Sequence, residues 1–315
     1  MTHTPDSYKL YRYTAYGLNI ASCIHCPELL PGNGSPDVTI RYGTVPDSLA
    51  SPKGKGVCYE ATPDQLLLSI NGVARFLVSG GEEILIDRAP NSDDAEIRLY
   101  LLGSALGALL HQRGLLPLHA SAFEANRGCI AILGHTGLGK STLAGVFRKR
   151  GYRIIADDVC LVSVNGIEAP LVLPAYPQLK LWADAARKLG EEPQAMPKIH
   201  RKFEKHGLPF KEGFCQEPLP LARIYVLSAN NTLEFSLRLL KGMEKLTAFI
   251  TNTYRAHFLE GLGRKASHFE QCVAVAKHAV VKCVTRPREP FLLDELADLL
   301  EKDFSYKNFR QDLCD

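Results

Sequence analysis

The sequence lacks any uncharged stretch of the roughly 18 to 20 residues that a membrane-spanning helix requires. It also lacks an apolar run at its start, because the segment 1–10 carries Asp6 and Lys9 among several polar side chains. From these two absences we expect a cytoplasmic protein with no membrane partner.

A large charge of one sign is missing as well. The 37 Lys and Arg residues against 34 Asp and Glu residues give a net charge of +3, which is too small to indicate a nucleic-acid surface. Nine cysteines lie scattered between Cys23 and Cys314, unlike the disulfide framework of a small secreted domain. We therefore expect reduced thiols and no nucleic-acid partner.

The composition and the residue patterns instead predict an α/β protein of two domains. With 46% hydrophobic residues the chain can bury a large core. Short β-branched runs between Gly and Pro clusters predict a β-rich N-terminal lobe over 1–92. Apolar residues at helical spacing predict a connecting helix over 94–113, capped by Ser92 or Asp93. This helix opens the second domain, 93–315.

The middle of the chain alternates between apolar strand patterns and a helical pattern. The segment 193–220 is rich in Pro, Lys, His and Gly, and we expect it to be irregular. The predicted strands lie at 118–123, 129–133, 153–156, 159–164 and 223–227, and the predicted helices at 140–150 and 290–302.

A glycine-rich segment at 134–141 reads GHTGLGKS and fits the pattern G-x-x-x-x-G-K-[ST] of a phosphate-binding loop. A strand pattern precedes it and a helical pattern follows it, as that function requires. Glycines let backbone N–H groups point at phosphate oxygens, while Lys140 can reach the terminal phosphates and Ser141 can bind magnesium. We predict a site for ATP and Mg2+ formed by Gly134, His135, Thr136, Gly137, Leu138, Gly139, Lys140, Ser141 and Thr142.

Two carboxylates, Asp157 and Asp158, follow the predicted strand 153–156. In a parallel sheet the carboxyl end of this strand lies beside the phosphate loop, where ligands of open α/β sheets collect. One carboxylate can hold magnesium while the other accepts a proton from an attacking hydroxyl. The alternative is a polar turn between two strands, because Asp pairs are common in turns.

Three short segments share their letters and their spacing with one family of kinases. They read LHAS at 118–121, GHTGLGKST at 134–142 and RGYRIIADD at 150–158. Together they resemble the catalytic core of the HPr serine kinase/phosphorylase family. The segment LPAYPQLKLW at 173–182 looks like the stand-alone HPr-kinase-like proteins of peptide-modification gene clusters, which include kinases of lasso-peptide precursors. The resemblance covers about residues 115–185.

The resemblance implies a P-loop core of the HPr kinase C-terminal and PEP carboxykinase type, and it implies roles for single residues. Asp157 matches the family's catalytic base, Asp158 its partner acid near the metal, and His119 a histidine beside the phosphates, with Lys140 completing the catalytic set. As a lone residue, His119 would more readily be interpreted as a core or turn histidine. The implied activity is transfer of phosphate from ATP to a serine of a peptide or small protein.

The chain departs from the family in one place. Where the bifunctional enzymes carry an acidic signature containing Arg-Gly, this sequence has YPQLK at 176–180 without a carboxylate. We therefore predict a kinase without phosphorylase activity, acting on a substrate other than HPr. A small-molecule kinase of the same fold and a non-catalytic nucleotide-sensing module stay open as alternatives, and so does a homo-oligomer.

Several cations outside these motifs are also candidates for the site. Arg264 and Arg286 are considered as transition-state cations of the kind used in phosphoryl transfer. A basic segment after the core is either a solvated surface or a clamp for phosphates or for an acidic peptide. Its members are Lys180, Arg187, Lys198, His200, Arg201, Lys202, Lys205, His206 and Lys211.

Overall fold

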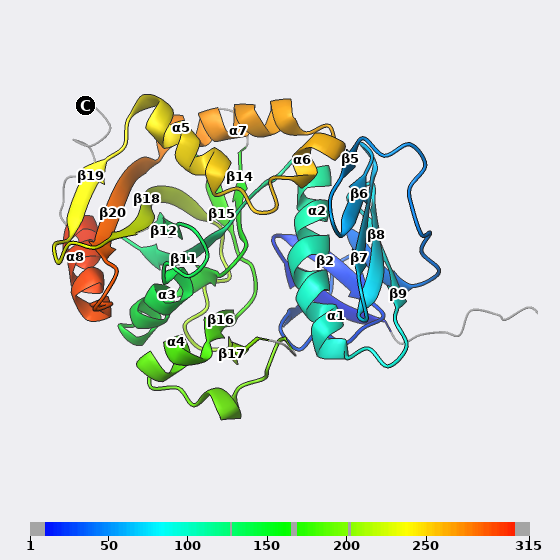
Figure 1. Cartoon of the computed structure of the whole chain (residues 1–315), viewed down its shortest axis with the longest axis horizontal. Helices are drawn as coiled ribbons and strands as arrows, with labels where there is room; N and C mark the ends of the chain where they lie inside the picture. The colour runs from blue at the N-terminus through cyan, green and yellow to red at the C-terminus, as the bar shows by residue number, and fades with distance from the viewer. Residues whose placement is uncertain (1–9, 127, 165–168, 201–202, 306–315) are drawn as a thin grey trace, which may run out of the picture.

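The computed structural model describes residues 10–126, 128–164, 169–200 and 203–305. The chain is a mixed α/β protein with two nine-stranded sheets that lie on either side of a helical segment (Figure 1). Within these ranges no helix combines the length and the apolar character that a membrane span needs.

The first sheet is formed by strands from the first third of the chain. They are β1 (Tyr11–Ala15), β2 (Leu18–Ser22), β3 (Leu30–Pro31), β4 (Val38–Tyr42), β5 (Gly54–Lys55), β6 (Tyr59–Ala61), β7 (Gln65–Ile70), β8 (Ala74–Ser79) and β9 (Glu83–Arg88). Their order is β3-β1-β2-β4-β9-β8-β7-β6-β5. From β5 to β9, each strand pairs antiparallel with the next one. Strand β4 is parallel to both of its neighbours, β2 and β9.

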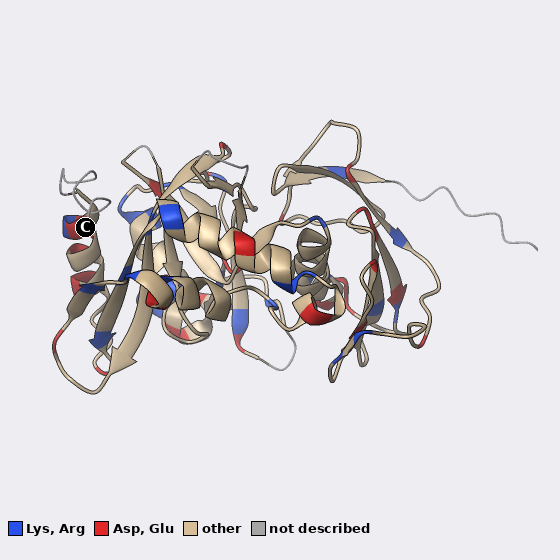
Figure 2. Ribbon diagram, turned by 90° about the horizontal axis from the view of Figure 1, so that it is seen from above, with Lys and Arg blue, Asp and Glu red and all other residues tan. Residues whose placement is uncertain are grey.

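A buried helical segment follows this sheet and fills its concave face. The Asp93 carboxylate accepts a hydrogen bond from the Ala95 N–H and caps the segment, as predicted. The predicted single helix is interrupted by a π-helical turn, so that α1 (Asp94–Tyr100), η1 (Leu101–Ala105) and α2 (Leu106–Gln112) follow one another. Figure 2 shows the sheet curving around this segment, with basic and acidic residues interspersed along the ribbon.

The second sheet carries the predicted phosphate loop. Its strands are β10 (Leu116–Leu118), β11 (Ala120–Ala125), β12 (Gly128–Leu133), β13 (Ile154–Ala156), β14 (Cys160–Ser163), β15 (Leu171–Leu173), β18 (Leu219–Asn230), β19 (Ser236–Leu239) and β20 (Val280–Pro287). Strands β12, β18 and β20 are parallel. Strand β11 lies between β12 and β13 and is antiparallel to both, so the carboxyl ends of β12 and β13 point to the same edge.

Helices cover both faces of this sheet (Figure 1). Helix α3 follows the glycine loop directly, as predicted, and ends at Lys149. The helices are α3 (Lys140–Lys149), α4 (Ala183–Lys188), α5 (Gly242–Thr251), α6 (Phe258–Gly261), α7 (Lys265–His278) and α8 (Leu293–Ser305), with a short 3-10 turn η2 (Pro193–Ala195).

Two sequence expectations differ from the structure. The strand predicted at 118–123 is broken at His119, because the chain leaves β10 and enters β11 there, and the His119 N–H bonds the Asn252 carbonyl instead of a strand neighbour. The segment 193–220, expected to be irregular, contains β17 (Lys205–Pro209), which pairs antiparallel with β16 (Gln178–Trp182). A strand that finds its partner so far along the chain leaves little local signal.

The two lobes share one hydrophobic core. A single cluster of buried side chains contains residues from the first sheet, the helical segment and the second sheet. At the boundary, the Tyr16 N–H donates to the Pro174 carbonyl at 2.7 Å, and the Tyr16 ring packs edge-on against Tyr176 with centroids 6.3 Å apart. The first lobe therefore contacts the chain just before β16.

A second cluster of buried side chains lies under α3, and four of its aromatic rings pack together there. Phe147 is fully buried and stacks on Phe123 with ring centroids 4.3 Å apart, while Tyr152 and Phe304 meet it edge-on or tilted. Such packing anchors α3, and with it the end of the glycine loop, on the sheet.

We predict that Phe147→Ala lowers the free energy of unfolding by about 3–5 kcal/mol, because it removes buried surface and leaves a cavity in this cluster. The midpoint of urea unfolding, followed by circular dichroism, measures the change. Phe269→Ala is the matched control, because Phe269 is about half exposed on α7 and should shift the midpoint little. Equal shifts for the two variants would contradict the anchoring role.

Candidate functional site

The loop between β12 and α3 requires glycine at particular positions. Gly134 and Gly139 have φ values of 143° and 98°, which residues with a side chain rarely adopt. A Cβ on Gly139 would lie 2.6 Å from the Phe291 ring, and one on Gly134 would lie 3.0 Å from the Leu227 carbonyl oxygen. The backbone therefore turns tightly here and leaves its N–H groups and the start of α3 beside a cavity.

Lys140 folds back over this loop. Its Nζ donates to the carbonyl of Gly134 at 2.6 Å and to that of His135 at 3.3 Å. Burial lowers the pKa of Lys140 to about 8, and the nearby charges of Asp157 and Asp158 only partly oppose this effect. The ammonium group is thus held where phosphate oxygens would meet the loop.

Arg286 supports the loop from behind. Its Nε and Nη2 donate to the Leu138 carbonyl at 3.3 and 3.2 Å, and its guanidinium lies 3.9 Å from the centre of the Phe291 ring. Arg264 bonds the Gln112 carbonyl at 2.7 Å. Neither arginine lines the cavities described below. Both side chains instead donate hydrogen bonds to backbone carbonyl groups.

Asp157 points into the protein interior. It is 3% exposed. The Ser121 hydroxyl donates to its Oδ1 at 2.5 Å and the Lys180 N–H donates to its Oδ2 at 2.8 Å. Both oxygens of the residue predicted to be the base are therefore engaged by the fold, and Asp157 lines neither cavity.

Asp158 points the other way, into the cavities. Its φ of 69° is left-handed, a strained conformation that is common at functional sites. The Lys180 Nζ donates to its Oδ2 at 2.9 Å. Burial raises the pKa of Asp158, but the positive charges of Lys180 and Lys205 outweigh burial and hold the pKa well below its usual range. Asp158 is therefore a carboxylate at every pH near neutrality.

His119 connects this turn to the glycine loop. Its Nδ1 donates to the Asp158 carbonyl at 3.0 Å, which leaves Nε2 to accept from the Thr136 hydroxyl at 3.4 Å. Burial and the charge of Lys140 lower its pKa, so the ring is neutral at pH 7. The predicted place of His119 beside the loop agrees with this geometry.

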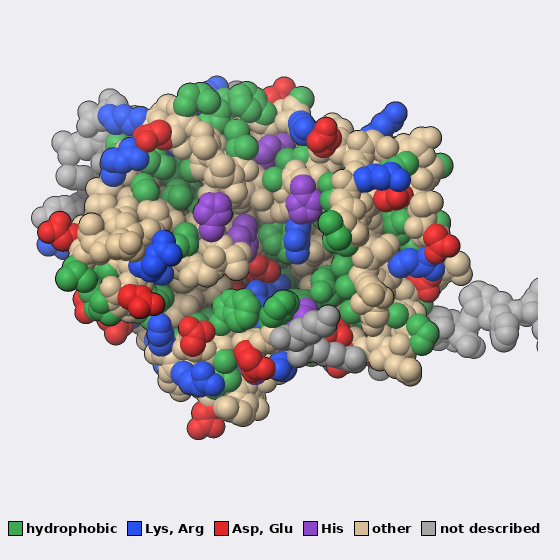
Figure 3. Space-filling view, in the orientation of Figure 1, with side chains coloured by type: hydrophobic (Ala, Val, Ile, Leu, Met, Phe, Trp, Pro, Cys, Tyr) green, Lys and Arg blue, Asp and Glu red, His purple; other side chains and the backbone are tan. Residues whose placement is uncertain are grey.

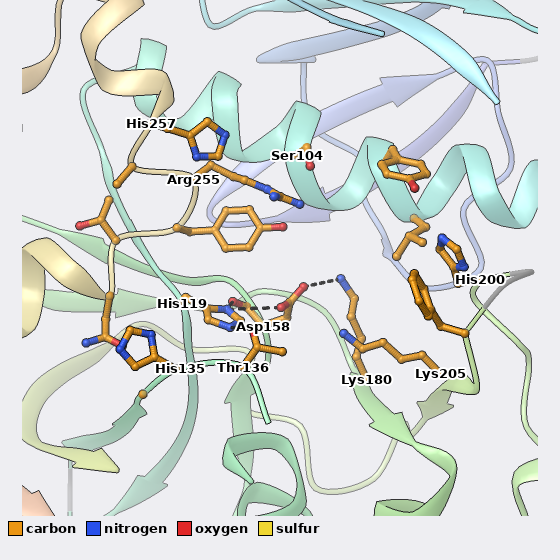
Figure 4. A pocket seen from close by; sticks show the side chains of 18 of the residues that line it. Ser104, His119, His135, Thr136, Asp158, Lys180, His200, Lys205, Arg255 and His257 are labelled. Atoms are coloured by element: carbon orange, nitrogen blue, oxygen red, sulfur yellow. Dashed lines mark hydrogen bonds and ion pairs between the residues drawn. The ribbon is translucent and has the colours of Figure 1, made fainter. Parts of the chain in front are cut away.

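Two cavities share His119 and Asp158 in their walls, and Figure 4 shows side chains that line the larger one. The smaller, of about 160 Å³, lies against the glycine loop and the first turn of α3 and includes Ser141 and Thr142. The larger, of about 680 Å³, extends toward α1 and η1. Both are lined by His119, Thr136, Asp158, Lys180, Trp182 and Lys205.

The larger cavity has walls from distant parts of the chain. Leu99, Tyr100 and Ser104 come from the helical segment, and a loop at 251–257 forms an adjoining wall that packs against this segment. Figure 3 shows the site as a hollow in this face of the molecule, where histidine, basic and acidic side chains gather. No sequence motif marked the 251–257 loop, and only its position in the fold brings it to the site.

The basic segment of the sequence contributes to this cavity in part. Lys180, His200 and Lys205 line it, because the pairing of β16 with β17 brings Lys205 opposite Trp182. Lys198 instead pairs with Glu204 at the surface, and Arg201 and Lys202 lie outside the described residues. Some members of the segment therefore lie at the surface and others line the cavity, and a clamp for phosphates or an acidic peptide stays a prediction.

Oxygen donors for a magnesium ion are present at the smaller cavity. The Ser141 hydroxyl and the Asp158 carboxylate both line it, and such oxygens are the ligands that Mg2+ prefers. Together with a loop whose conformation excludes side chains at Gly134 and Gly139, the donor set fits a magnesium-bound triphosphate.

Comparisons with known proteins find only a remote structural similarity for this chain. No protein-family model matches the chain, and a search of curated proteins finds no match. Among solved structures, the HPr(Ser) kinase/phosphatase from Coxiella burnetii aligns with 60% of this chain and 90% of its own, at a TM-score of 0.33 and 11% sequence identity. A likeness at this level does not establish a shared function.

We predict that the affinity for a nucleoside triphosphate falls as the pH rises through about 8. The protonated form of Lys140 binds phosphate, and its pKa of about 8 means that the free protein loses this proton above that pH, at a cost of up to about tenfold in affinity per pH unit. Calorimetric titration with ATP and Mg2+ between about pH 7.5 and pH 9.5 measures the slope, outside the range in which His119 titrates.

Lys140→Arg is the control for this titration, because arginine stays protonated throughout the range. Its affinity should change little with pH even where it is weaker than that of the natural protein. A natural protein whose affinity is equally independent of pH would contradict the role of Lys140.

Proposed function

We propose that this protein is an ATP-dependent phosphotransferase that transfers the terminal phosphate to a hydroxyl group. The observation that carries the proposal is the junction of the two cavities, where Lys140 and Ser141 on one side and Asp158 between them face the same space. A phosphate site that opens directly onto a second, larger cavity with a carboxylate at the junction suits transfer better than storage of a nucleotide.

The smaller cavity would hold the triphosphate. Backbone N–H groups of the glycine loop and the N-terminus of α3 favour negative charge, and Lys140 adds a full positive charge. Ser141, together with phosphate oxygens and water, would hold the magnesium ion, which when bound neutralises charge on the phosphates. His119 keeps the loop and the Asp158 turn in register through its two hydrogen bonds.

Asp158 takes the role of base in this proposal, in place of Asp157. A base must lie within hydrogen-bond reach of the hydroxyl that it deprotonates, and Asp158 is the only carboxylate among the described residues that line the larger cavity. The acceptor oxygen forms a bond to the terminal phosphorus, the bond from phosphorus to the bridging oxygen breaks, and the hydroxyl proton passes to Asp158. Because the transition state is loose, a weak base suffices.

Asp157 and Lys180 keep this base in position. Burial lowers the pKa of Lys180, yet the charge of Asp158 more than offsets burial and the pKa lies well above its usual value. Lys180 therefore stays charged and holds the Asp158 carboxylate, while Asp157 fixes the Lys180 backbone. Lys205 lines both cavities and can stabilise charge on the phosphoryl group in transit.

For the acceptor we propose a serine hydroxyl of a peptide or small protein, as the sequence resemblance implies. A small-molecule acceptor is the second candidate, and one observation favours it. The cavity of about 680 Å³ lies within the range of about 300–1,000 Å³ that encloses small ligands. A nucleotide-sensing module without catalysis is the remaining alternative, and activity distinguishes it.

The decisive test compares Asp158→Asn with Asp157→Asn. The protein is incubated with ATP, Mg2+ and serine-containing peptides or small hydroxyl compounds, and mass spectrometry detects a gain of phosphate. We expect Asp158→Asn to lose transfer by roughly 10²- to 10⁴-fold while it retains ATP, and Asp157→Asn to lose stability first, because Asp157 accepts two internal hydrogen bonds.

The opposite result, in which only Asp157→Asn abolishes transfer in a folded protein, would return the base to Asp157. Transfer by neither the natural protein nor the variants, despite tight binding of ATP, would favour the sensing module.

A further inference from the structure

The larger cavity carries positive charge that the protein itself does not neutralise. Lys180, Lys205 and Arg255 line it, and Asp158 is the only carboxylate among the described residues that do so. That carboxylate is bound by Lys180 at 2.9 Å. Among the ion pairs of the described residues, none includes Lys205 or Arg255. Lys205 is half-buried and Arg255 is exposed at the cavity wall, so both cations are accessible to an anionic ligand.

The nucleotide accounts for Lys205 but not for Arg255. Lys205 lines the smaller cavity as well and lowers the pKa of Lys140 by its charge, so it lies near the phosphate site. Arg255 lines only the larger cavity and not the smaller one. An anion bound by Arg255 would therefore lie in the larger cavity beyond the phosphates, where the proposed acceptor would bind.

The backbone that carries Arg255 is fixed before any ligand arrives. The preceding residue, Tyr254, donates its N–H to the Pro117 carbonyl at 2.9 Å, and His111 Nε2 bonds the Tyr254 carbonyl at 2.8 Å. Thr253 forms a bridge with Leu118. A loop tied to β10 and to α2 in this way holds its side chains at a defined wall of the cavity.

A notch in the helical segment receives the Tyr254 ring. A Cβ added to Gly103 would lie 3.1 Å from the Tyr254 hydroxyl oxygen, and one added to Gly107 would lie 2.9 Å from the ring. Gly103 belongs to the π-helical turn, a feature that is frequent at functional sites. The absence of side chains at both glycines lets the loop approach the helix closely.

Arg255 itself adopts an uncommon backbone conformation. Its φ is 53°, in the left-handed region that residues other than glycine, asparagine and aspartate seldom occupy. Its guanidinium carbon lies 5.4 Å from the centre of the Tyr254 ring. Figure 4 shows the side chain extending into the cavity on the side of Ser104. The aromatic face fixes one side of the guanidinium and leaves its N–H groups for a planar or tetrahedral anion.

We propose that Arg255 binds an anionic group of the acceptor, either a carboxylate or a phosphate, so that the acceptor is a negatively charged hydroxyl compound. The term acceptor rests on the proposed function, but the anion site does not. The guanidinium fork suits both groups, since each offers two oxygens at the right spacing. Its place at the wall opposite the phosphate loop would orient the acceptor hydroxyl toward Asp158.

Three compounds that differ only in one group test this proposal. Glycerol is neutral, glycerate carries a carboxylate and glycerol 3-phosphate carries a phosphate. Each is titrated by calorimetry into the full chain saturated with Mg2+ and a non-hydrolysable ATP analogue, so that the phosphate loop is filled. We expect one or both anions to bind on the order of 10- to 100-fold more tightly than glycerol, as expected for hydrogen bonds to a charged group, and the tighter anion identifies the group.

Arg255→Gln should abolish this preference, and Arg255→Lys should retain part of it, because lysine keeps the charge without the fork. Arg238→Gln is the matched control, since Arg238 lies at the surface on β19 and pairs with Glu244, and it should bind as the natural protein does. Thermal unfolding establishes that each variant is folded.

Two results would overturn the inference: glycerol and both anions binding alike, or an anion preference that survives in Arg255→Gln. Its failure is separable from that of the proposed function. Anion binding through Arg255 without any phosphate transfer would refute the transferase and leave the anion site in place. Transfer to neutral acceptors without an anion preference would do the reverse.

Discussion

The site depends on the way Lys180 is held by two consecutive aspartates. Asp157 accepts a hydrogen bond from the Lys180 backbone N–H, and Asp158 accepts one from the Lys180 ammonium group. The left-handed turn at Asp158 sends the two carboxylates to opposite sides of the chain. Without this turn, both cavities would lose the carboxylate at their junction, and β16 would lose its tie to the end of β13.

The local parts of this arrangement could be predicted from the sequence. A strand, a glycine loop and a helix lie in one short stretch, and the residue types of this stretch favour these conformations locally. In the structure, β12, the loop and α3 follow one another in that order. The cap at Asp93 was predicted for the same reason, because its hydrogen bond to Ala95 spans two residues. His119 was placed beside the loop from its spacing within the resemblance.

The parts that depend on distant contacts could not be predicted. Which of two adjacent aspartates faces the cavities is decided by Ser121 and the backbone of Lys180, neither of which has any sequence signal for that role. Strand β17 is visible only through its pairing with β16. Arg255 enters the site because Tyr254 fits against Gly103 and Gly107, a match of shapes between segments that are far apart in the chain.

The contact of Tyr16 with Pro174 and Tyr176 bears on how such a protein can be divided or recombined. The N-terminal lobe contacts the chain just before β16, and its buried residues belong to the same hydrophobic cluster as those of the second sheet. A C-terminal part cut from this chain would expose that apolar surface to water. Exchange of the N-terminal lobe for another would therefore require a replacement whose apolar surface matches the second sheet at this boundary.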